Sequence, residues 1–317
     1  MKYTFLMPSY KAKYFKAALD SILAQTYTDY QVIISDDNSP ENLDKLVEEY
    51  SSNKNFPKIK YIKGKNNIGG KDLVLHWNKI LNYCNSEYII MASDDDIYHP
   101  NFLEKIDELS IKYPEVDVLR ARTMRIDLNG NPTSKEDIFD EKQTGIEAIH
   151  SIFCGNYIGC IGNYVFKTSS IQEAGGFIYM PYAWFSDLLT VANHIISKGQ
   201  TNTKDILFQF RISNQNISNI KHNKEVEKEK LLATIKTDQW LSSFFETIKV
   251  NDSFEDRLKN DSITAYKHRI YGQCGDYSWA IPFYKWVKIY KQLKQNKYFS
   301  AKSFFKYFSL SIINRTF

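Results

Sequence analysis

Short apolar runs alternate with helical stripes through the first half of this chain of 317 residues. Tyr3–Met7 is an apolar run that Pro8 ends, and Val32–Ile34 is a second such run. Between them, apolar side chains recur at the spacing of one helix face, at Phe15, Ala18, Leu19, Ile22 and Leu23. The runs predict buried strands, and the stripe predicts a helix.

The same alternation continues toward residue 120. Further strands are predicted at Ile59–Ile62, Tyr88–Met91 and Val116–Leu119. Three more helices are predicted, from Pro40 to about Tyr50, from Leu73 to Leu81 and from Pro100 to Leu109. Ser39 can cap the first of these helices, with Pro40 at its first position. Strands and helices that alternate at this spacing predict an α/β fold with a mixed, mostly parallel sheet flanked by helices.

The pattern changes after about residue 129. A strand is predicted at Ile206–Ile212 and a helix from near Ser186, whereas the stretch Cys154–Asn163 is irregular. Beyond Asn219 the chain becomes helical and charged, over residues 225–248 and then 254–271. We therefore expect an α/β domain over residues 1–219 and a helical C-terminal extension over residues 220–317.

Composition narrows the class of protein. With 43% hydrophobic and 25% charged residues, the chain has enough apolar material for a folded core. Its apolar stretches are too short to span a membrane and its first residues do not resemble a signal peptide, so we expect a cytoplasmic protein. The four cysteines form no CxxC pair, which argues against a disulfide framework or a structural zinc site.

The net charge of +4 is unevenly distributed along the chain. Residues 277–317 carry eight Lys or Arg side chains and no Asp or Glu. A nucleic-acid-binding protein usually carries its basic surface on the folded domain, so we expect no nucleic-acid partner. In this tail, apolar residues recur on one helical face, at Phe283, Trp286, Val287, Tyr290 and Leu293. The pattern fits either a peripheral helix at the inner face of an anionic membrane or a face that packs on the domain or on a second copy of the chain.

Polar clusters follow three of the predicted strands. They are Pro8-Ser9-Tyr10, Asp36-Asp37-Asn38 and Ser93-Asp94-Asp95-Asp96. Because ligands of open α/β sheets gather at the carboxyl ends of the strands, this coincidence predicts a ligand site at one edge of the sheet.

The carboxylates of these clusters, and one later carboxylate, each admit two roles. Asp94, Asp95 and Asp96 repel one another, so they either bind Mg²⁺ or Mn²⁺ or form a solvated turn that caps the next helix. Asp37 either accepts a hydrogen bond from a ring N–H or forms an Asx-turn. Asp187 lies among apolar residues, so it is either a general base with a raised pKa or a helix N-terminal acid.

Taken in order, the motifs resemble the family 2 glycosyltransferases with the GT-A fold. The matching segments are Pro8-Ser9-Tyr10, Ser21–Tyr27, Val32–Ser39, Asn67-Ile68-Gly69, Asn78, Glu87–Asp96, Gly175-Gly176-Phe177 and Ser186-Asp187. The likeness covers about residues 1–215. It implies a Rossmann-like GT-A catalytic domain and an inverting transfer of a sugar from a nucleotide-sugar, usually UDP-linked. The acceptor would be a hydroxyl of a glycan or of a lipid-linked sugar, in bacterial surface polysaccharide synthesis.

The resemblance also implies roles for single residues. It places the nucleotide against Pro8, Ser9, Tyr10, Asp37, Asn67, Asn78 and Asp94. Asp95, together with Asp96, would bind Mn²⁺ or Mg²⁺, and Asp187 would be the catalytic base. Arg211 would contact the diphosphate or the acceptor. Apart from the resemblance, Trp184 lies three residues before this proposed base, where it is a candidate to stack on the acceptor.

The chain departs from the family pattern at two positions. Ser93 stands where the first acid of the DxD motif is expected, and Arg211-Ile212-Ser213 stands where relatives often carry Arg-x-His. Two other functions would use parts of the same pattern. A phosphohydrolase of the haloacid dehalogenase type would use Asp94 and Asp96, but its motif normally lies near the chain start. A non-catalytic nucleotide-sugar-binding relative would lack the base that Asp187 offers.

Overall fold

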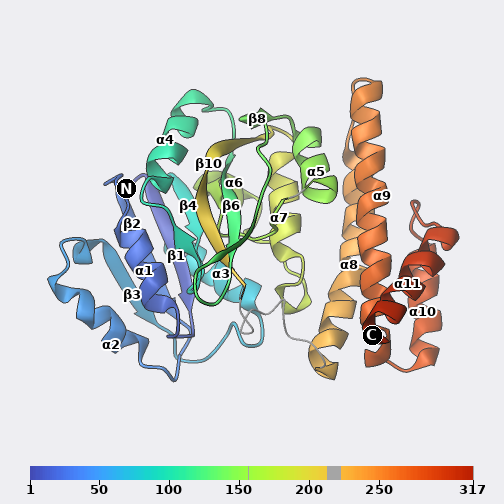
Figure 1. Ribbon diagram of the computed structural model, residues 1–317, viewed down its shortest axis with the longest axis horizontal. Helices are drawn as coiled ribbons and strands as arrows, with labels where there is room; N and C mark the ends of the chain where they lie inside the picture. The colour runs from blue at the N-terminus through green and yellow to red at the C-terminus, as the bar shows by residue number, and fades with distance from the viewer. Residues whose placement is uncertain (156, 213–222, 317) are drawn as a thin grey trace.

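The computed structural model describes residues 1–155, 157–212 and 223–316, with side chains through residue 312. Within these residues, one ten-stranded sheet carries helices on both faces (Figure 1). Its strands are β1 (Tyr3–Ser9), β2 (Tyr30–Asp36), β3 (Ile59–Lys63), β4 (Tyr88–Met91), β5 (Ile97–Tyr98), β6 (Val118–Ile126), β7 (Pro132–Lys135), β8 (Lys142–Gln143), β9 (Tyr164–Lys167) and β10 (Gln200–Arg211).

The sheet has the strand order β3-β2-β1-β4-β9-β6-β10-β5, with β7 paired to β6 and β8 to β10. Parallel pairing joins β3, β2, β1 and β4, and it also joins β6 to β10. Strand β9 runs antiparallel between β4 and β6. The structure confirms the predicted mixed sheet with helices on its faces. The sheet is mostly parallel, because most of its strands pair in parallel with at least one neighbour.

The helices cover both faces of the sheet. They are α1 (Phe15–Leu23), α2 (Leu43–Glu48), α3 (Leu73–Leu81), α4 (Phe102–Lys112), α5 (Gly145–Cys154), α6 (Thr168–Glu173), α7 (Ser186–Ile195), α8 (Lys224–Thr247), α9 (Ser253–Asp276), α10 (Phe283–Lys294) and α11 (Ala301–Thr316). Successive strand residues point to opposite faces. Phe5 of β1 therefore packs in one core with α1 and α4, while the next residue, Leu6, packs in a second core with α3 and α7.

One predicted helix begins later than expected. Helix α2 begins at Leu43 rather than at Pro40. The Ser39 hydroxyl accepts the backbone N–H of Glu41 in a turn, and Asn42 has a left-handed backbone with φ 52°. Because Ser39 takes part in this turn, it does not cap a helix that begins at Pro40.

The C-terminal extension packs directly on the α/β part of the chain. Helices α8 and α9 stand beside α5 and α7, and α10 and α11 lie on their outer side (Figure 1). The ring of Phe153 on α5 lies 5.9 Å from that of Phe245 and 6.1 Å from that of Tyr266. The expected boundary at residue 219 lies outside the described residues. Among the described residues, no helix combines the length and the apolar character that crossing a bilayer requires.

Helix α10 has two different faces. Ile289 and Leu293 are buried, and the ring of Trp286 packs on that of Phe308 from α11 at 5.2 Å. Phe283, however, is 83% exposed. The apolar face predicted for this helix is therefore divided, because part of it packs on the extension and part faces outward.

Candidate active site

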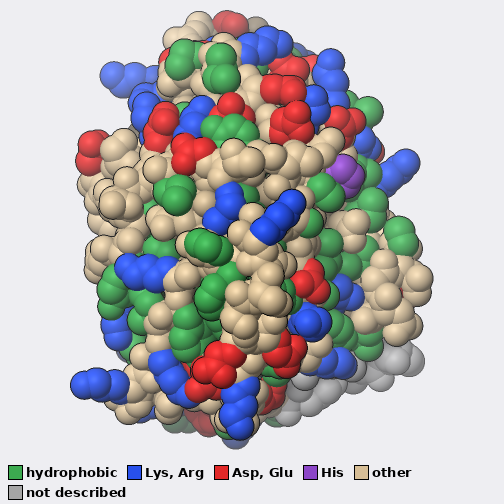
Figure 2. Space-filling view, turned by 90° about the vertical axis from the view of Figure 1, so that its left-hand side faces the viewer, with side chains coloured by type: hydrophobic (Ala, Val, Ile, Leu, Met, Phe, Trp, Pro, Cys, Tyr) green, Lys and Arg blue, Asp and Glu red, His purple; other side chains and the backbone are tan. Residues whose placement is uncertain are grey.

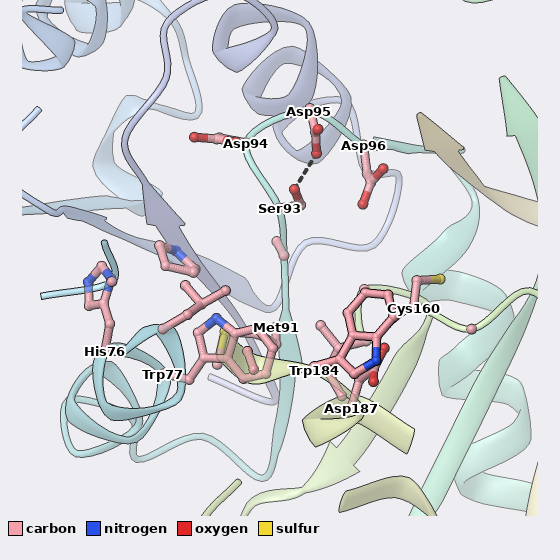
Figure 3. A pocket seen from close by; sticks show the side chains of 18 of the residues that line it. His76, Trp77, Met91, Ser93, Asp94, Asp95, Asp96, Cys160, Trp184 and Asp187 are labelled. Carbon is pink, nitrogen blue, oxygen red and sulfur yellow. Dashed lines mark hydrogen bonds between the residues drawn. The ribbon is translucent and has the colours of Figure 1, made fainter. Parts of the chain in front are cut away.

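A cavity of about 850 Å³ opens at the sheet edge where β1 and β4 end. Its lining includes ten of the residues singled out from the sequence: Pro8, Ser9, Tyr10, Asp37, Asn67, Asp94, Asp95, Asp96, Trp184 and Asp187. Asn78 and Arg211, also singled out, are not part of this lining. Figure 3 shows the Ser93–Asp96 turn on one side of the cavity, with Trp184 and Asp187 close together and away from His76.

We call the part of the cavity around Tyr10, Asp37, Asn67 and Gly69 the loop end. Here the Asp37 carboxylate accepts the backbone N–H groups of Ile68 at 2.8 Å and Gly69 at 2.6 Å. A Cβ at Gly69 would lie 3.0 Å from Asp37 Oδ2, so this close approach suits glycine. The carboxylate thus fixes the loop before α3 against the end of β2.

The buried histidine beside Asp37 is predicted to be neutral. His76 Nδ1 lies 3.9 Å from an Asp37 oxygen, and Nε2 lies 2.8 Å from the Ser35 hydroxyl. Burial lowers the pKa of His76, which outweighs the opposite influence of Asp37. Burial thus disfavours a positive charge on His76 next to the Asp37 carboxylate.

The two asparagines predicted to bind the nucleotide stabilise turns. Asn67 Oδ1 accepts the N–H of Gly70 at 2.6 Å, inside the lining of the cavity. The Asn78 amide donates to the carbonyl of Phe177 at 3.0 Å and accepts its N–H at 2.7 Å. A Cβ at Gly176, where φ is 93°, would lie 2.3 Å from Asn78 Oδ1. Asn78 therefore holds the glycine turn before α7 rather than facing the cavity.

Two carboxylates of the acidic turn are bound to the backbone. Asp94 Oδ2 accepts the N–H groups of Tyr10 and Lys11, both at 3.0 Å. Burial raises the pKa of Asp94 to about 6, although these two hydrogen bonds oppose the shift. Asp96 is 2% exposed, and its Oδ1 accepts the N–H of Arg211 at 2.9 Å. Both side chains thus connect the turn to neighbouring segments.

Asp95 differs from its two neighbours because its carboxylate accepts a side-chain donor, the Ser93 hydroxyl (Figure 3). Burial raises the pKa of Asp95, while the positive charges of Lys11 and Arg211 lower it. The Arg211 guanidinium donates to the backbone carbonyls of Asp95 at 2.9 Å and Asp127 at 3.1 Å. Arg211 therefore orients the turn and is not among the residues that line the cavity, and Ser213 lies outside the described residues.

The donor set fits a cation that is shared with a phosphate ligand. The described residues contain no group of three His, Cys, Asp or Glu side chains placed to hold a metal ion. Magnesium commonly uses only one or two protein carboxylates when substrate phosphates supply further ligands. Asp95 suits this role, because Asp94 and Asp96 already accept backbone N–H groups.

We call the part of the cavity around Tyr182, Trp184, Phe185 and Asp187 the aromatic end. Asp187 lies in the first turn of α7, where its Oδ1 accepts the N–H of Leu188 at 2.7 Å. Burial raises the pKa of Asp187. A protonatable carboxylate beside an open cavity can accept a proton from a bound ligand.

The backbone that leads into Asp187 is strained. Tyr182, Ala183 and Phe185 have left-handed φ angles of 59°, 53° and 71°. Non-glycine residues seldom adopt this region, and a cluster of such residues typically marks a functional site. The surrounding structure must therefore hold this turn in place.

Helices of the extension supply part of that support. Trp184 Nε1 donates to Gln273 Oε1 of α9 at 3.2 Å. Lys230 Nζ of α8 lies 4.4 Å from the centroid of the Trp184 ring. Trp184 is thus oriented at the cavity by two helices that follow it in the chain.

Several lining residues were not found from the sequence. Arg269 reaches the cavity from α9, and Lys71 and Arg125 contribute two further positive charges. Lys11 directly follows Pro8-Ser9-Tyr10, so its position offered a signal. Arg269 offered none, because it lies in a charged helix far along the chain from every cavity motif.

Comparison with known proteins identifies the family. The family model described as glycosyl transferase family 2 matches residues 4–175, more than half of the chain. An Escherichia coli protein named UDP-Glc:alpha-D-GlcNAc-diphosphoundecaprenol beta-1,3-glucosyltransferase WfgD is 25% identical over 230 residues, which cover 70% of this chain and 83% of that protein. An uncharacterized glycosyltransferase of Methanocaldococcus jannaschii is 33% identical over 121 residues, which span 38% of this chain but only 40% of that relative.

Solved structures share the fold. S. aureus TarS, residues 1–349 in complex with UDP-GlcNAc, has a TM-score of 0.67 at 16% identity, covering 100% of this chain and 92% of that one. The mannosyltransferase PcManGT from Pyrobaculum calidifontis, in complex with GDP-Man and Mn²⁺, has a TM-score of 0.59 at 12% identity, with coverages of 100% and 87%. The resemblance seen in the sequence motifs is confirmed by the family match, and the chain belongs to glycosyl transferase family 2.

Proposed function

We propose that the protein is an inverting glycosyltransferase that moves a sugar from a UDP-sugar to a hydroxyl of a glycan or lipid-linked acceptor. One observation carries this proposal: the desolvated carboxylate of Asp187 opens into the same cavity as Asp37 and Asp95. The nucleoside would lie at the loop end, near Pro8, Ser9, Tyr10 and Asn67. The acceptor would lie at the aromatic end, against Trp184.

The reaction follows from this arrangement. Asp187 takes the proton of the acceptor hydroxyl as its oxygen attacks the anomeric carbon. The new glycosidic bond forms on the face opposite the nucleotide, the bond to the diphosphate breaks, and the configuration inverts. The products are the glycoside and the nucleoside diphosphate, with the proton on Asp187. Lys11, at the loop end beside Asp95, faces the developing negative charge of the leaving group.

Asp95 would hold a divalent cation, Mn²⁺ or Mg²⁺, together with the donor diphosphate. When bound, such an ion would supply positive charge to balance that of the diphosphate. Asp96 would support the turn from behind, since it is buried against the Arg211 backbone.

The relatives support the choice of substrates. TarS was solved with UDP-GlcNAc, and the name of the E. coli relative specifies UDP-Glc and an acceptor linked to diphosphoundecaprenol. PcManGT was solved with GDP-Man, so a guanine nucleotide is the competing donor. A lipid-linked acceptor would place the protein in surface polysaccharide synthesis.

The alternatives have less support. A phosphohydrolase of the dehalogenase type would need Asp94 as a nucleophile, but Asp94 Oδ2 accepts two backbone N–H groups and the chain belongs to another family. A non-catalytic binding protein would have no use for a strained turn that presents Asp187 to the cavity.

A donor panel tests the proposal. Thermal shift and nucleotide release are measured with UDP-, GDP- and dTDP-sugars, each in Mn²⁺ and in EDTA. We expect a UDP-sugar to give the largest stabilisation and slow UDP release, both only with the cation. Equal stabilisation by UDP in EDTA would refute the metal role, and stabilisation by none of the sugars would refute the function.

We also propose that the outer face of α10 contacts an anionic membrane. Phe283, Tyr284 and Val287 are 83%, 69% and 47% exposed. Exposed lysines share this outward side of the helix, at Lys288, Lys291 and Lys294. Aromatic rings beside lysines suit the interface of an anionic bilayer, and residues 277–317 contain no acidic residue to oppose it.

Vesicle co-sedimentation tests this contact with the full chain. The double variant Phe283→Ser/Val287→Ser should stay in the supernatant where the wild type pellets with phosphatidylglycerol vesicles at low salt. The control, Ile111→Ser, removes a side chain that is 69% exposed on α4. If neither protein pellets and the wild type runs as a dimer that the double variant disrupts, the face binds a second copy instead.

A further inference from the structure

We infer that Arg269 of helix α9 is a positioning residue of the active site, which supplies the positive charge facing Asp187 and holds the turn that presents it. The inference rests on the proposed role of Asp187 as the base. It makes the C-terminal extension a working part of the catalytic centre rather than an appendage.

Arg269 contacts the turn that presents Asp187 at the aromatic end of the cavity. Arg269 lines the same cavity as Asp187, and its guanidinium carbon lies 4.9 Å from the centroid of the Phe185 ring. Phe185 has a left-handed backbone and immediately precedes the first turn of α7. A cation over this ring favours the strained conformation, because the same contact would be lost if the turn relaxed.

The groups around Asp187 have opposite effects on its pKa. Burial raises the pKa of Asp187, and the positive charge of Arg269 opposes that shift. The Cys160 thiol also lies near Asp187, and its own pKa is raised well above the usual value by burial. Tyr277, which directly follows α9, interacts electrostatically with Arg269.

Among the described residues, several charged groups on the other elements near α7 interact with groups other than Asp187. Arg120 on β6 is buried in an ion pair with Glu136. Glu147 on α5 caps its own helix through Thr144. Lys230 on α8 lies over Trp184. Arg125 on β6 also lines the cavity, but Arg269 is the side chain whose positive charge opposes the raised pKa of Asp187.

A general base must be unprotonated when the acceptor arrives. Removal of the Arg269 charge should therefore protonate Asp187 at a higher pH. Turnover should be roughly tenfold lower on the acidic limb of the pH profile, and the deficit should close as the pH rises.

The experiment compares Arg269→Gln, Arg269→Lys and the control Arg257→Gln. Arg257 also lies on α9 over a phenylalanine ring, 5.6 Å from Phe254, but outside the cavity lining. The titration of the Asp187 carboxyl carbon is followed by NMR of aspartate-labelled protein, with Asp187→Asn to identify the signal. We expect the titration of Asp187 to move to higher pH in Arg269→Gln, and to stay near the wild-type position in Arg269→Lys and in the control.

The turnover profile of each protein is measured in parallel. An unchanged Asp187 titration in Arg269→Gln would overturn the inference, as would a turnover loss that is equal at every pH. The NMR titration does not depend on activity, so it stays informative if no donor is turned over. That outcome would refute the proposed function while the titration still decides the role of Arg269.

Discussion

The two ends of the cavity hold their carboxylates in different ways. At the loop end, Asp37 and Asp94 each accept two backbone N–H groups from segments close to the strand ends. At the aromatic end, Asp187 accepts one neighbouring N–H and otherwise faces aromatic rings and the charge of Arg269. The first arrangement holds each carboxylate in place through the backbone, whereas the second leaves a carboxylate oxygen open to a proton from a bound ligand.

This difference predicts a division of labour. A carboxylate held by backbone N–H groups suits recognition of a ligand, because its position does not depend on the reaction. A desolvated carboxylate of raised pKa suits proton transfer. Substitutions at the loop end should therefore act mainly on donor affinity, and substitutions at the aromatic end mainly on turnover.

The largest effect is expected from Asp187→Asn. The amide keeps the shape of the carboxylate but cannot accept the proton, so turnover should fall by about 10²–10⁴-fold. UDP affinity, measured by calorimetry, should change little. The control Asp205→Asn removes an exposed carboxylate outside the cavity and should leave both quantities unchanged. Near-normal turnover in Asp187→Asn would show that another group is the base.

Asp95→Ala should have the next largest effect. The loss of the carboxylate that suits the cation should remove the dependence of UDP binding on Mn²⁺ and most of the activity. Calorimetry in Mn²⁺ and in EDTA measures the first effect. If UDP binding by Asp95→Ala still depended strongly on Mn²⁺, residues other than Asp95 would hold the ion.

Asp37→Ala should weaken donor binding without a matching loss of turnover. One charge-assisted hydrogen bond is worth about 1.5–3 kcal/mol, so UDP affinity should fall about ten- to a hundredfold. Turnover at saturating donor should change much less. An unchanged affinity would limit Asp37 to holding the Ile68–Gly69 loop.

The smallest effect is expected from Asn78→Ala. Loss of the paired hydrogen bonds to Phe177 should lower the free energy of unfolding by about 1–3 kcal/mol. Asn82→Ala, at the exposed end of the same helix, is the control. Chemical denaturation measures both. A loss of UDP affinity with unchanged stability would instead show that Asn78 takes part in nucleotide binding.

The loop end could be predicted from the sequence because its residues follow buried strands directly. The runs at Tyr3–Met7, Val32–Ile34 and Tyr88–Met91 indicated a sheet, and the edge of a parallel sheet brings the next residues together. Strands β1 to β4 and β6, the helices through α4 and most of the cavity motifs followed from this local pattern, whereas the short strands β5, β7 and β8 did not. The start of α2 did not, because Ser39 forms a turn instead of a cap.

The aromatic end could be predicted only in part. A family motif indicated Asp187, and Trp184 stood out because it lies three residues before it, but their environment comes from residues 230, 269 and 273. Contacts between helices so far apart in the chain leave no local periodicity to detect. The contacts of Asn78 and Arg211 could not be predicted either. Their positions in the motifs did not reveal that their side chains stabilise backbone turns.

In the proposed reaction, a single carboxylate, Asp187, acts at the aromatic end in a direct displacement. Hydrolysis of an α-linked UDP-sugar tests it without knowledge of the acceptor, because water then takes the place of the hydroxyl. Proton NMR of the sugar in the first minutes, before mutarotation, reveals its anomeric configuration. Direct displacement predicts that the β-anomer appears first and that Asp187→Asn slows its release. Initial formation of the α-anomer would contradict the account.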